Sequence, residues 1–210
     1  SLTVTSILFN LKILLLFSCF GFGQKPNVID IQNKGLSELN RQYSLFVNHE
    51  GLLYIGANDG MFTFDGVNYK TLVTTSILSK AVNGIKSDEA NRIWCKNFSN
   101  ELFQIRNDTL FVHDGVTSYL IKESKNLVDY VTHENDIYFI TDGQLAKYSE
   151  KDGVEVLVNS SGILKTNERF NSVIFTSLVK SGNNLYLASL NELYQYDLKT
   201  KDLKAYKAFK

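Results

Sequence analysis

Three carboxylate residues occupy comparable places in the sequence, each shortly after an apolar run that is centred on an aromatic residue. They are Asp59, Asp142 and Glu192. Carboxylates that a fold brings together from separate segments can bind a polar ligand or act as a general acid and base. Polar residues are also common at hairpin tips for the sake of turn geometry alone. We therefore treat these three as weak candidates for ligand binding.

Other residues with reactive side chains are scarce. The three histidines are His49, His113 and His133, and two of them stand before Glu50 and Glu134 in similar polar turns. No second carboxylate or cysteine lies at the spacing of a metal site, so we expect these two histidines to be solvated turn residues. Nucleophile-elbow, phosphate-loop and dinucleotide motifs do not occur. The sequence predicts no catalytic residue, no metal site and no cofactor.

The elements that must position any site come from a repeated pattern. An apolar run with a central aromatic residue is followed, seven or eight residues later, by a second apolar run. The aromatic residues, spaced 40, 44 and 48 residues apart, are Tyr54, Trp94, Tyr138 and Tyr186. A period of roughly 40 to 50 residues with strand and turn content is typical of β-propeller blades.

Flanking runs complete each copy of the pattern to four strands. Polar turns such as Asp65-Gly66 separate the runs, and these residue types suit tight hairpins. The inner runs, such as "IYFI" from Ile137, are apolar on both faces, as expected for a sheet that packs between two others. The aromatic residues are expected to pack between blades, where burial of each ring contributes roughly 1.5 to 3 kcal/mol.

The predicted fold class is therefore all-β. Proline occurs once, whereas the chain has 14 Phe and 11 Tyr. Helical periodicity is hard to find, and Thr74 to Val82 is expected to be a loop with at most one helical turn. We predict a partial β-propeller of about four blades, each of four antiparallel strands. The expected domain covers 24–210, with units at about 40–80, 81–126, 127–171 and 172–210.

The N-terminal segment has the pattern of a secretory signal peptide. Residues 1–23 carry one charge, Lys12, before the mostly apolar run "ILLLFSCFGF". That run is too short to span a bilayer. Cys19 leaves open a lipoprotein anchor as an alternative. The chain starts at Ser1 and has a single Met, Met61, so we expect it to be a piece of a longer reading frame.

Charge and cysteine content narrow the function further. The chain has 22 basic and 22 acidic residues, and such neutrality argues against nucleic acid as the main partner. After the signal peptide no segment is apolar enough to cross a membrane. Cys95 lies in the apolar stretch "RIWCK" and is expected to be a buried thiol without a disulfide partner.

Residues 33–72 resemble the two-component regulator propeller repeat. The matching positions are Gly35-Leu36-Ser37, Gly51, Tyr54-Ile55-Gly56, Asp59-Gly60 and Asp65-Gly66. Later copies depart from the pattern, because Cys95-Lys96 replaces the Ile-Gly step and Ser189-Leu190-Asn191 lacks the Asp-Gly hairpin. Propellers of this family form the extracytoplasmic sensor part of membrane receptors, many of them hybrid histidine kinases.

The resemblance implies a non-catalytic periplasmic sensor module that binds a small molecule or glycan and acts on downstream receptor modules or a dimer partner. Two alternatives are a propeller enzyme, a lyase or hydrolase, and a stand-alone secreted or surface scaffold. The loops between the second and third strands share a face with those that enter each blade. That face is the usual place for ligands, so we expect a site there.

Overall fold

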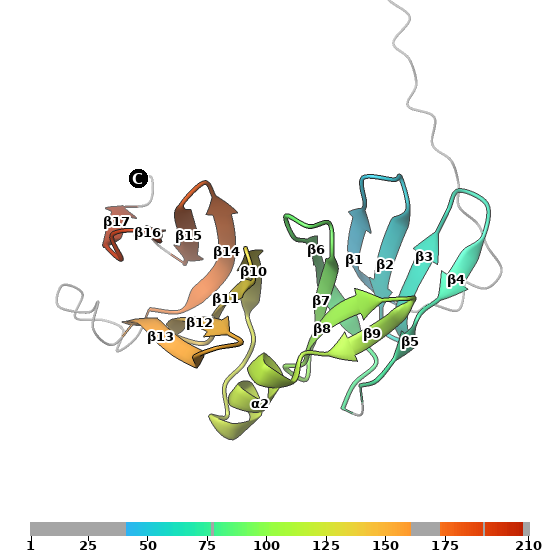
Figure 1. Ribbon diagram of the computed structural model, residues 1–210, viewed down its shortest axis with the longest axis horizontal. Coiled ribbons are helices and arrows are strands. Elements are labelled where there is room, and N and C mark those ends of the chain that lie inside the picture. The colour runs from blue at the N-terminus through green and yellow to red at the C-terminus, as the bar shows by residue number, and fades with distance from the viewer. Residues whose placement is uncertain (1–40, 77, 161–172, 191, 208–210) are drawn as a thin grey trace, which may run out of the picture. The chain divides into compact units, whose positions relative to one another are not determined.

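The computed structural model describes residues 41–76, 78–160, 173–190 and 192–207. The expected signal peptide, Cys19 and Gly35-Leu36-Ser37 lie outside them. The described chain forms four sheets (Figure 1). The first sheet contains β1 (Gln42–Val47), β2 (Leu53–Ala57), β3 (Gly60–Phe64) and β4 (Tyr69–Thr71). The second contains β5 (Val73–Thr74), β6 (Val82–Ser87), β7 (Ile93–Asn97), β8 (Leu102–Arg106) and β9 (Thr109–Val112).

The remaining two sheets have the four-strand plan of the first. The third sheet contains β10 (Asp129–His133), β11 (Asp136–Ile140), β12 (Gln144–Ser149) and β13 (Gly153–Asn159). The fourth contains β14 (Phe175–Ser181), β15 (Asn184–Ser189), β16 (Glu192–Asp197) and β17 (Leu203–Lys207). Within each of these sheets, consecutive strands pair antiparallel in chain order, as the repeats predict.

The second sheet has a fifth strand that the sequence pattern did not predict. β5 pairs parallel with β9, with Val73 opposite Thr109. The expected first unit, at about 40–80, therefore contributes two residues to the neighbouring sheet. This short connection ties the fourth strand of the first sheet directly to the outer edge of the second.

Side chains of turn residues explain why the first two hairpins form where they do. In the β1–β2 turn, Asn48 Oδ1 accepts the backbone N–H of Glu50 at 3.1 Å and of Leu52 at 2.8 Å. In the β6–β7 turn, Asp88 Oδ1 accepts the corresponding N–H groups of Ala90 and Arg92 at 2.9 and 2.8 Å. A side chain that bonds the following backbone in this way fixes the turn and hence the register of its strands.

Three apolar clusters join neighbouring sheets, which accounts for strands that are apolar on both faces. Tyr54 packs in a cluster of residues from the first and second sheets. Trp94 belongs to a cluster of the second and third sheets, and Tyr138 to one of the third and fourth. Tyr186, in the fourth sheet, is half-buried. The aromatic residues of the first three repeats thus pack between sheets, as expected.

A side chain at one repeated position also links the first strands of neighbouring sheets. Ser44 Oγ in β1 accepts the Ile85 N–H of β6 at 3.1 Å. At the equivalent position of β10, Asp129 Oδ2 accepts the Leu178 N–H of β14 at 2.9 Å. The inner strands are therefore held together by polar contacts as well as by the apolar clusters.

The expectation of strands and turns throughout is wrong at one place, because helix α2 (Asp114–Lys122) follows β9. Val116 and Leu120, four residues apart, are buried in the cluster between the second and third sheets. The helix is short, and its N-cap is His113 rather than a more common capping residue; the His113 side chain accepts the N–H of Val116, in the first turn. The Thr74 to Val82 segment has no helix among its described residues.

Cys95 is a free, fully buried thiol, as the sequence predicts. Its burial raises the pKa of the thiol far above its ordinary value, so the group is not a nucleophile. The part of the chain that the structure describes includes no helix of the length and apolar character that a bilayer crossing needs.

Candidate functional site

The three candidate carboxylates lie at separate hairpins, and no hydrogen bond between described residues joins any two of them. Asp59 is exposed in the β2–β3 turn. Asp142, in the β11–β12 turn, accepts a hydrogen bond from Asn126 Nδ2 at 2.7 Å. Glu192 begins β16 and accepts a hydrogen bond from the hydroxyl of Tyr194. Their role in ligand binding stays a prediction.

Asp142 has a visible structural role on its face of the propeller. Asn126, which donates to Asp142, accepts a hydrogen bond from Asn100 Nδ2 at 3.2 Å. Asn100 in turn accepts the Leu127 N–H at 2.8 Å. This chain of side-chain amides ties the β7–β8 turn of the second sheet to the β11–β12 turn of the third.

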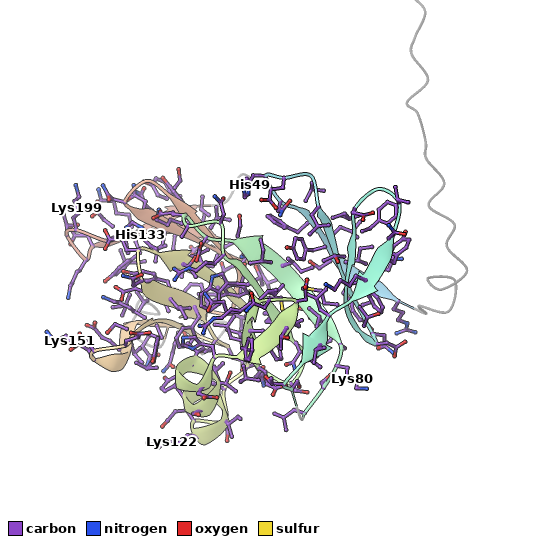
Figure 2. All side chains as sticks on the ribbon, turned by 45° about the vertical axis from the view of Figure 1, so that its right-hand side comes forward. His49, Lys80, Lys122, His133, Lys151 and Lys199 are labelled. Carbon is purple, nitrogen blue, oxygen red and sulfur yellow. The ribbon has the colours of Figure 1, made fainter. Side chains whose placement is uncertain are left out.

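A cavity of about 420 Å³, lined by both charged and apolar residues, lies near the ends of the first strands of the sheets, towards the turns that connect first and second strands. In Figure 2, His49 and His133 mark that end of their hairpins, while Lys80 and Lys122 precede first strands at the other end. We call the cavity of about 420 Å³ the inner-strand cavity. Its lining comes from the second, third and fourth sheets: Lys86, Ser87, Asp88, Glu89, Trp94, Tyr130, Val131, Thr132, Leu178, Val179 and Lys180.

Lys86 connects three sheets at the base of this cavity. Its Nζ donates to Asp129 Oδ1 at 2.5 Å and to the Tyr130 carbonyl at 2.8 Å, and lies 3.5 Å from the Leu178 carbonyl. The ammonium also lies 5.2 Å from the centre of the Tyr130 ring. The Tyr130 hydroxyl donates to the Gly84 carbonyl at 2.7 Å, and burial raises its pKa. Tyr130 is therefore a neutral donor.

A second ionic group crosses from the second sheet to the fourth. Glu89 Oε1 accepts from Lys180 Nζ at 2.6 Å and lies 3.2 Å from His133 Nδ1. Hydrogen bonds from Lys180 and then His133 lower the pKa of Glu89 to about 2. Glu89 is therefore ionised throughout the physiological range and can act only as an acceptor. His133 contacts this group, so the expectation of a solvated turn residue is wrong for it and holds for the exposed His49.

The third ionic group positions Trp94. Asp88 Oδ2 accepts from the Arg92 Nε–H at 2.5 Å and from the Trp94 Nε1–H at 2.9 Å. These hydrogen bonds lower the pKa of Asp88, although its partial burial acts in the opposite direction. The carboxylate thus fixes both the ring and the guanidinium, whose carbon lies 5.9 Å from the ring centre.

The charged residues that line the cavity are balanced in sign, two basic and two acidic: Lys86, Lys180, Asp88 and Glu89. A ligand in this cavity meets donors and acceptors of both signs, beside an apolar wall that includes Val131 and Leu178. A neutral molecule with several hydroxyl groups suits such a surface better than an ion does, because an ion would compete with the existing pairs. The arrangement favours binding of a neutral polar ligand.

The repeats contain a signal for Lys86 that sequence reasoning missed. Lys86 stands opposite the anchor Trp94 in its hairpin, and the equivalent positions hold Phe46, Val131 and Val179. A basic residue in an otherwise apolar column indicates a special contact. Glu89 and Lys180 carried no comparable signal, because a charged residue near a turn is ordinary.

No protein-family model and no curated protein matches this chain. Among solved structures, one similar structure is the extracellular domain of BT4673 from B. thetaiotaomicron, assigned to the hybrid two-component systems. It is 17% identical with a TM-score of 0.58, and the match covers 80% of this chain and 23% of that one. The extracellular domain of BT3049 from the same organism, assigned likewise, is 16% identical with a TM-score of 0.58, covering 83% and 26%.

Virginiamycin B lyase from Staphylococcus aureus is also similar in fold. It is 10% identical with a TM-score of 0.57, and the match covers 82% of this chain and 57% of the lyase. Identities of this order show the fold alone. The chain has the β-propeller fold, and its structural neighbours include extracellular domains of hybrid two-component systems, in agreement with the sequence resemblance. The chain spans about a quarter of the length of these two extracellular domains.

Proposed function

We propose that this chain is a non-catalytic, extracytoplasmic sensor module whose inner-strand cavity binds a neutral polar ligand such as a sugar. The observation that carries the proposal is the cavity itself, in which Lys86 and Glu89 of the second sheet bond groups of the third and fourth. A ligand that breaks or strengthens these hydrogen bonds between sheets changes the relative stability of alternative arrangements of the blades. Such differential contact is what a sensor needs to shift a receptor between states.

The likeness to extracellular domains of hybrid two-component systems supports the same proposal. Under this proposal, residues 1–23 direct secretion, with lipoprotein processing at Cys19 as the alternative. Downstream receptor modules or a dimer partner receive the signal. The activity of the whole protein is part of the proposal, because this chain spans only a fraction of those relatives.

Ligand titration tests the proposal. Neutral disaccharides, beginning with maltose and cellobiose, are added to the purified chain while its melting temperature is measured. We expect one of the panel to raise the melting temperature in a saturable manner and to be recovered unchanged by mass spectrometry. Lys180→Gln removes a cavity donor and is expected to weaken that response several-fold. A panel without effect, or an unaltered response in the variant, would contradict the proposal.

The fold of virginiamycin B lyase favours a propeller enzyme as the second candidate function. In that case Asp59 and Asp142 are the carboxylates to test, because turns between second and third strands present them at one face. A lyase or hydrolase reaction would convert the ligand during incubation, and Asp59→Ala or Asp142→Ala would abolish the conversion. Recovery of intact ligand after prolonged incubation decides for the sensor.

A further inference from the structure

Two cavities occupy equivalent places between successive pairs of sheets. The first, of about 350 Å³, lies between the first and second sheets and is lined in part by Tyr54, Leu72 and Ile105. The second, of about 430 Å³, lies between the second and third sheets and is lined in part by Trp94, His113 and Tyr148. We call the latter the aromatic cavity. Because the two cavities are equivalent, their lining residues can be compared position by position.

Strand register shows that these lining residues correspond one to one. Tyr54 and Trp94 are the anchors of their sheets. Leu72 and His113 each follow a fourth strand and donate their N–H to equivalent carbonyls, those of Met61 and Leu102. Tyr148 stands opposite Ile137 in the third sheet, the place that Ile105 has in the second. Two aliphatic side chains in the first cavity are thus replaced by two rings in the aromatic cavity.

The three rings form one group. The centre of the His113 ring lies 5.8 Å from that of Trp94 and 4.9 Å from that of Tyr148, the latter pair edge to face. Trp94 is buried, while His113 and Tyr148 are half-buried and line the open part. Burial lowers the pKa of His113, and its Nδ1 accepts the Val116 N–H at 3.3 Å. The neutral ring therefore carries its proton on Nε2.

Helix α2 makes room for Tyr148 in this arrangement. A Cβ on Gly115, in the first turn, would lie 2.2 Å from Tyr148 Cε2 and 2.5 Å from its hydroxyl oxygen. Glycine is otherwise unfavourable inside a helix by about 1 kcal/mol relative to alanine. The absence of a side chain at Gly115 thus allows the phenol ring of Tyr148 to lie against the helix and beside His113.

The basic groups of the aromatic cavity are less compensated than those of the inner-strand cavity. The Arg106 Nε–H donates to Gln104 Oε1 at 2.5 Å, which leaves the terminal NH₂ groups of the guanidinium for other acceptors. Among the described residues no carboxylate lies within ion-pair distance of Arg106 or Lys151. Glu150 is the opposing charge in the lining, whereas Asp136 is paired with Lys147 at 2.7 Å.

From this geometry we infer that the aromatic cavity is a second ligand site, selective for a small planar carboxylic acid. The flat ring of the ligand packs against His113 and Tyr148, and its carboxylate accepts hydrogen bonds from the Arg106 guanidinium, whose fork matches two carboxylate oxygens. The site is separate from the inner-strand cavity, although Trp94 lines both. It does not depend on the proposed sensing of a neutral ligand.

Trp94 provides the readout, because the chain contains one Trp. The chain is titrated with benzoate and, in parallel, with benzamide, a neutral molecule of the same shape. We expect benzoate to change the Trp94 fluorescence in a saturable manner, with the same affinity by calorimetry, and benzamide to bind about tenfold more weakly or worse. Equal affinities for the two probes, or no saturable benzoate binding, would overturn the inference.

Two variants locate the site. Arg106→Gln is expected to weaken benzoate binding about tenfold or more while the far-UV circular dichroism spectrum is retained. Arg41→Gln, at an exposed position before β1, removes the same charge and is expected to leave benzoate affinity unchanged. Gly115→Ala should weaken benzoate and benzamide alike, since it displaces the Tyr148 ring and alters no charge. Benzoate binding that survives Arg106→Gln would refute the site, whatever the outcome for disaccharides in the inner-strand cavity.

Discussion

Lys86 shows how one residue can give a repeated scaffold a local function. Its equivalents in the other sheets are apolar, and its ammonium bonds the side chain of Asp129 and the carbonyl of Tyr130 instead of packing. The exposed fractions of the Lys86 and Asp129 side chains are 33% and 17%. Removal of one partner from such a pair leaves a partly buried charge without compensation, which costs more than loss of a surface ion pair.

We therefore expect Lys86→Met to lower the free energy of unfolding by about 1 to 3 kcal/mol. Lys70→Met is the matched control, because Lys70 and Asp108 form a pair in which the side chains are 60% and 55% exposed. The control should change stability by less than about 1 kcal/mol. Denaturant titration of both variants measures the difference, and equal losses would show that Lys86 acts only as a surface residue.

His113 makes stability depend on pH. Burial lowers its pKa below the ordinary 6.5, and the nearby Asp114 and Glu150 only partly oppose this. Well above pH 6.5 the ring is neutral in both the folded and the unfolded chain, so its titration does not change the free energy of unfolding. As the pH falls through about 6.5 towards the folded-state pKa, the unfolded chain binds the proton more readily, and the fold loses stability.

His113→Asn tests this dependence, because asparagine keeps a capping acceptor for α2 and does not titrate. The variant loses the ring contacts with Trp94 and Tyr148 at every pH, so the test is the change between about pH 7.5 and 5.5. We expect the melting temperature of the variant to fall less over that interval than that of the natural chain. An equal loss of stability on acidification in the variant and the natural chain would contradict a role of His113 in the acid sensitivity.

At the scale of the element, close contact of neighbouring sheets depends on residues without a side chain. A Cβ on Gly56 in β2 would lie 2.6 Å from the backbone carbonyl oxygen of Val82 in β6. A backbone oxygen in a strand cannot move aside as a flexible side chain can. The glycine in the Tyr54-Ile55-Gly56 step of the repeat thus has a packing reason in the first sheet.

Gly56→Ala is accordingly expected to destabilise the chain by about 1 to 3 kcal/mol. Gly51→Ala is a useful comparison, because Gly51 has a φ of +84° with open space around it. That variant introduces only backbone strain, about 1 to 2 kcal/mol. Crystal or solution structures should show the first and second sheets displaced in Gly56→Ala alone; an unchanged interface would refute the packing argument.

At the scale of the whole molecule, each sheet depends on its neighbours. Met61, Leu102 and Leu145 hold the same place in the first three sheets, are fully buried, and belong to the clusters that join each sheet to the next. Leu193, their equivalent in the fourth sheet, is 41% exposed, and Val179 in the first strand of that sheet is 57% exposed. An apolar face of this kind promotes association in solution.

We expect Leu193→Lys to reduce concentration-dependent self-association of the chain, because it places a charge in the middle of that face. Val67→Lys is the control: Val67 is 81% exposed in a turn of the first sheet, away from the equivalent position. Sedimentation velocity over a range of concentrations measures the effect. Association that is unaltered by Leu193→Lys, or equally reduced by Val67→Lys, would exclude the face as its cause.

The sequence by itself determined the repeat, its aromatic anchors and the burial of Cys95, because strand pattern and turn chemistry are local properties that recur at each copy. It did not predict α2, whose short apolar stripe follows an uncommon cap, or the parallel pairing of β5, which depends on a contact between segments far apart in the chain. Lys86 was readable from the alignment of repeats, but its partners were not.

Only the tertiary structure decided which side chains meet. Glu89, His133 and Lys180 come from three repeats and converge because successive sheets bring the ends of their first strands together. The same packing keeps Asp59, Asp142 and Glu192 at separate hairpins. Convergence of residues from different blades is set by the distances between sheets, and a pattern within one repeat carries no information about those distances.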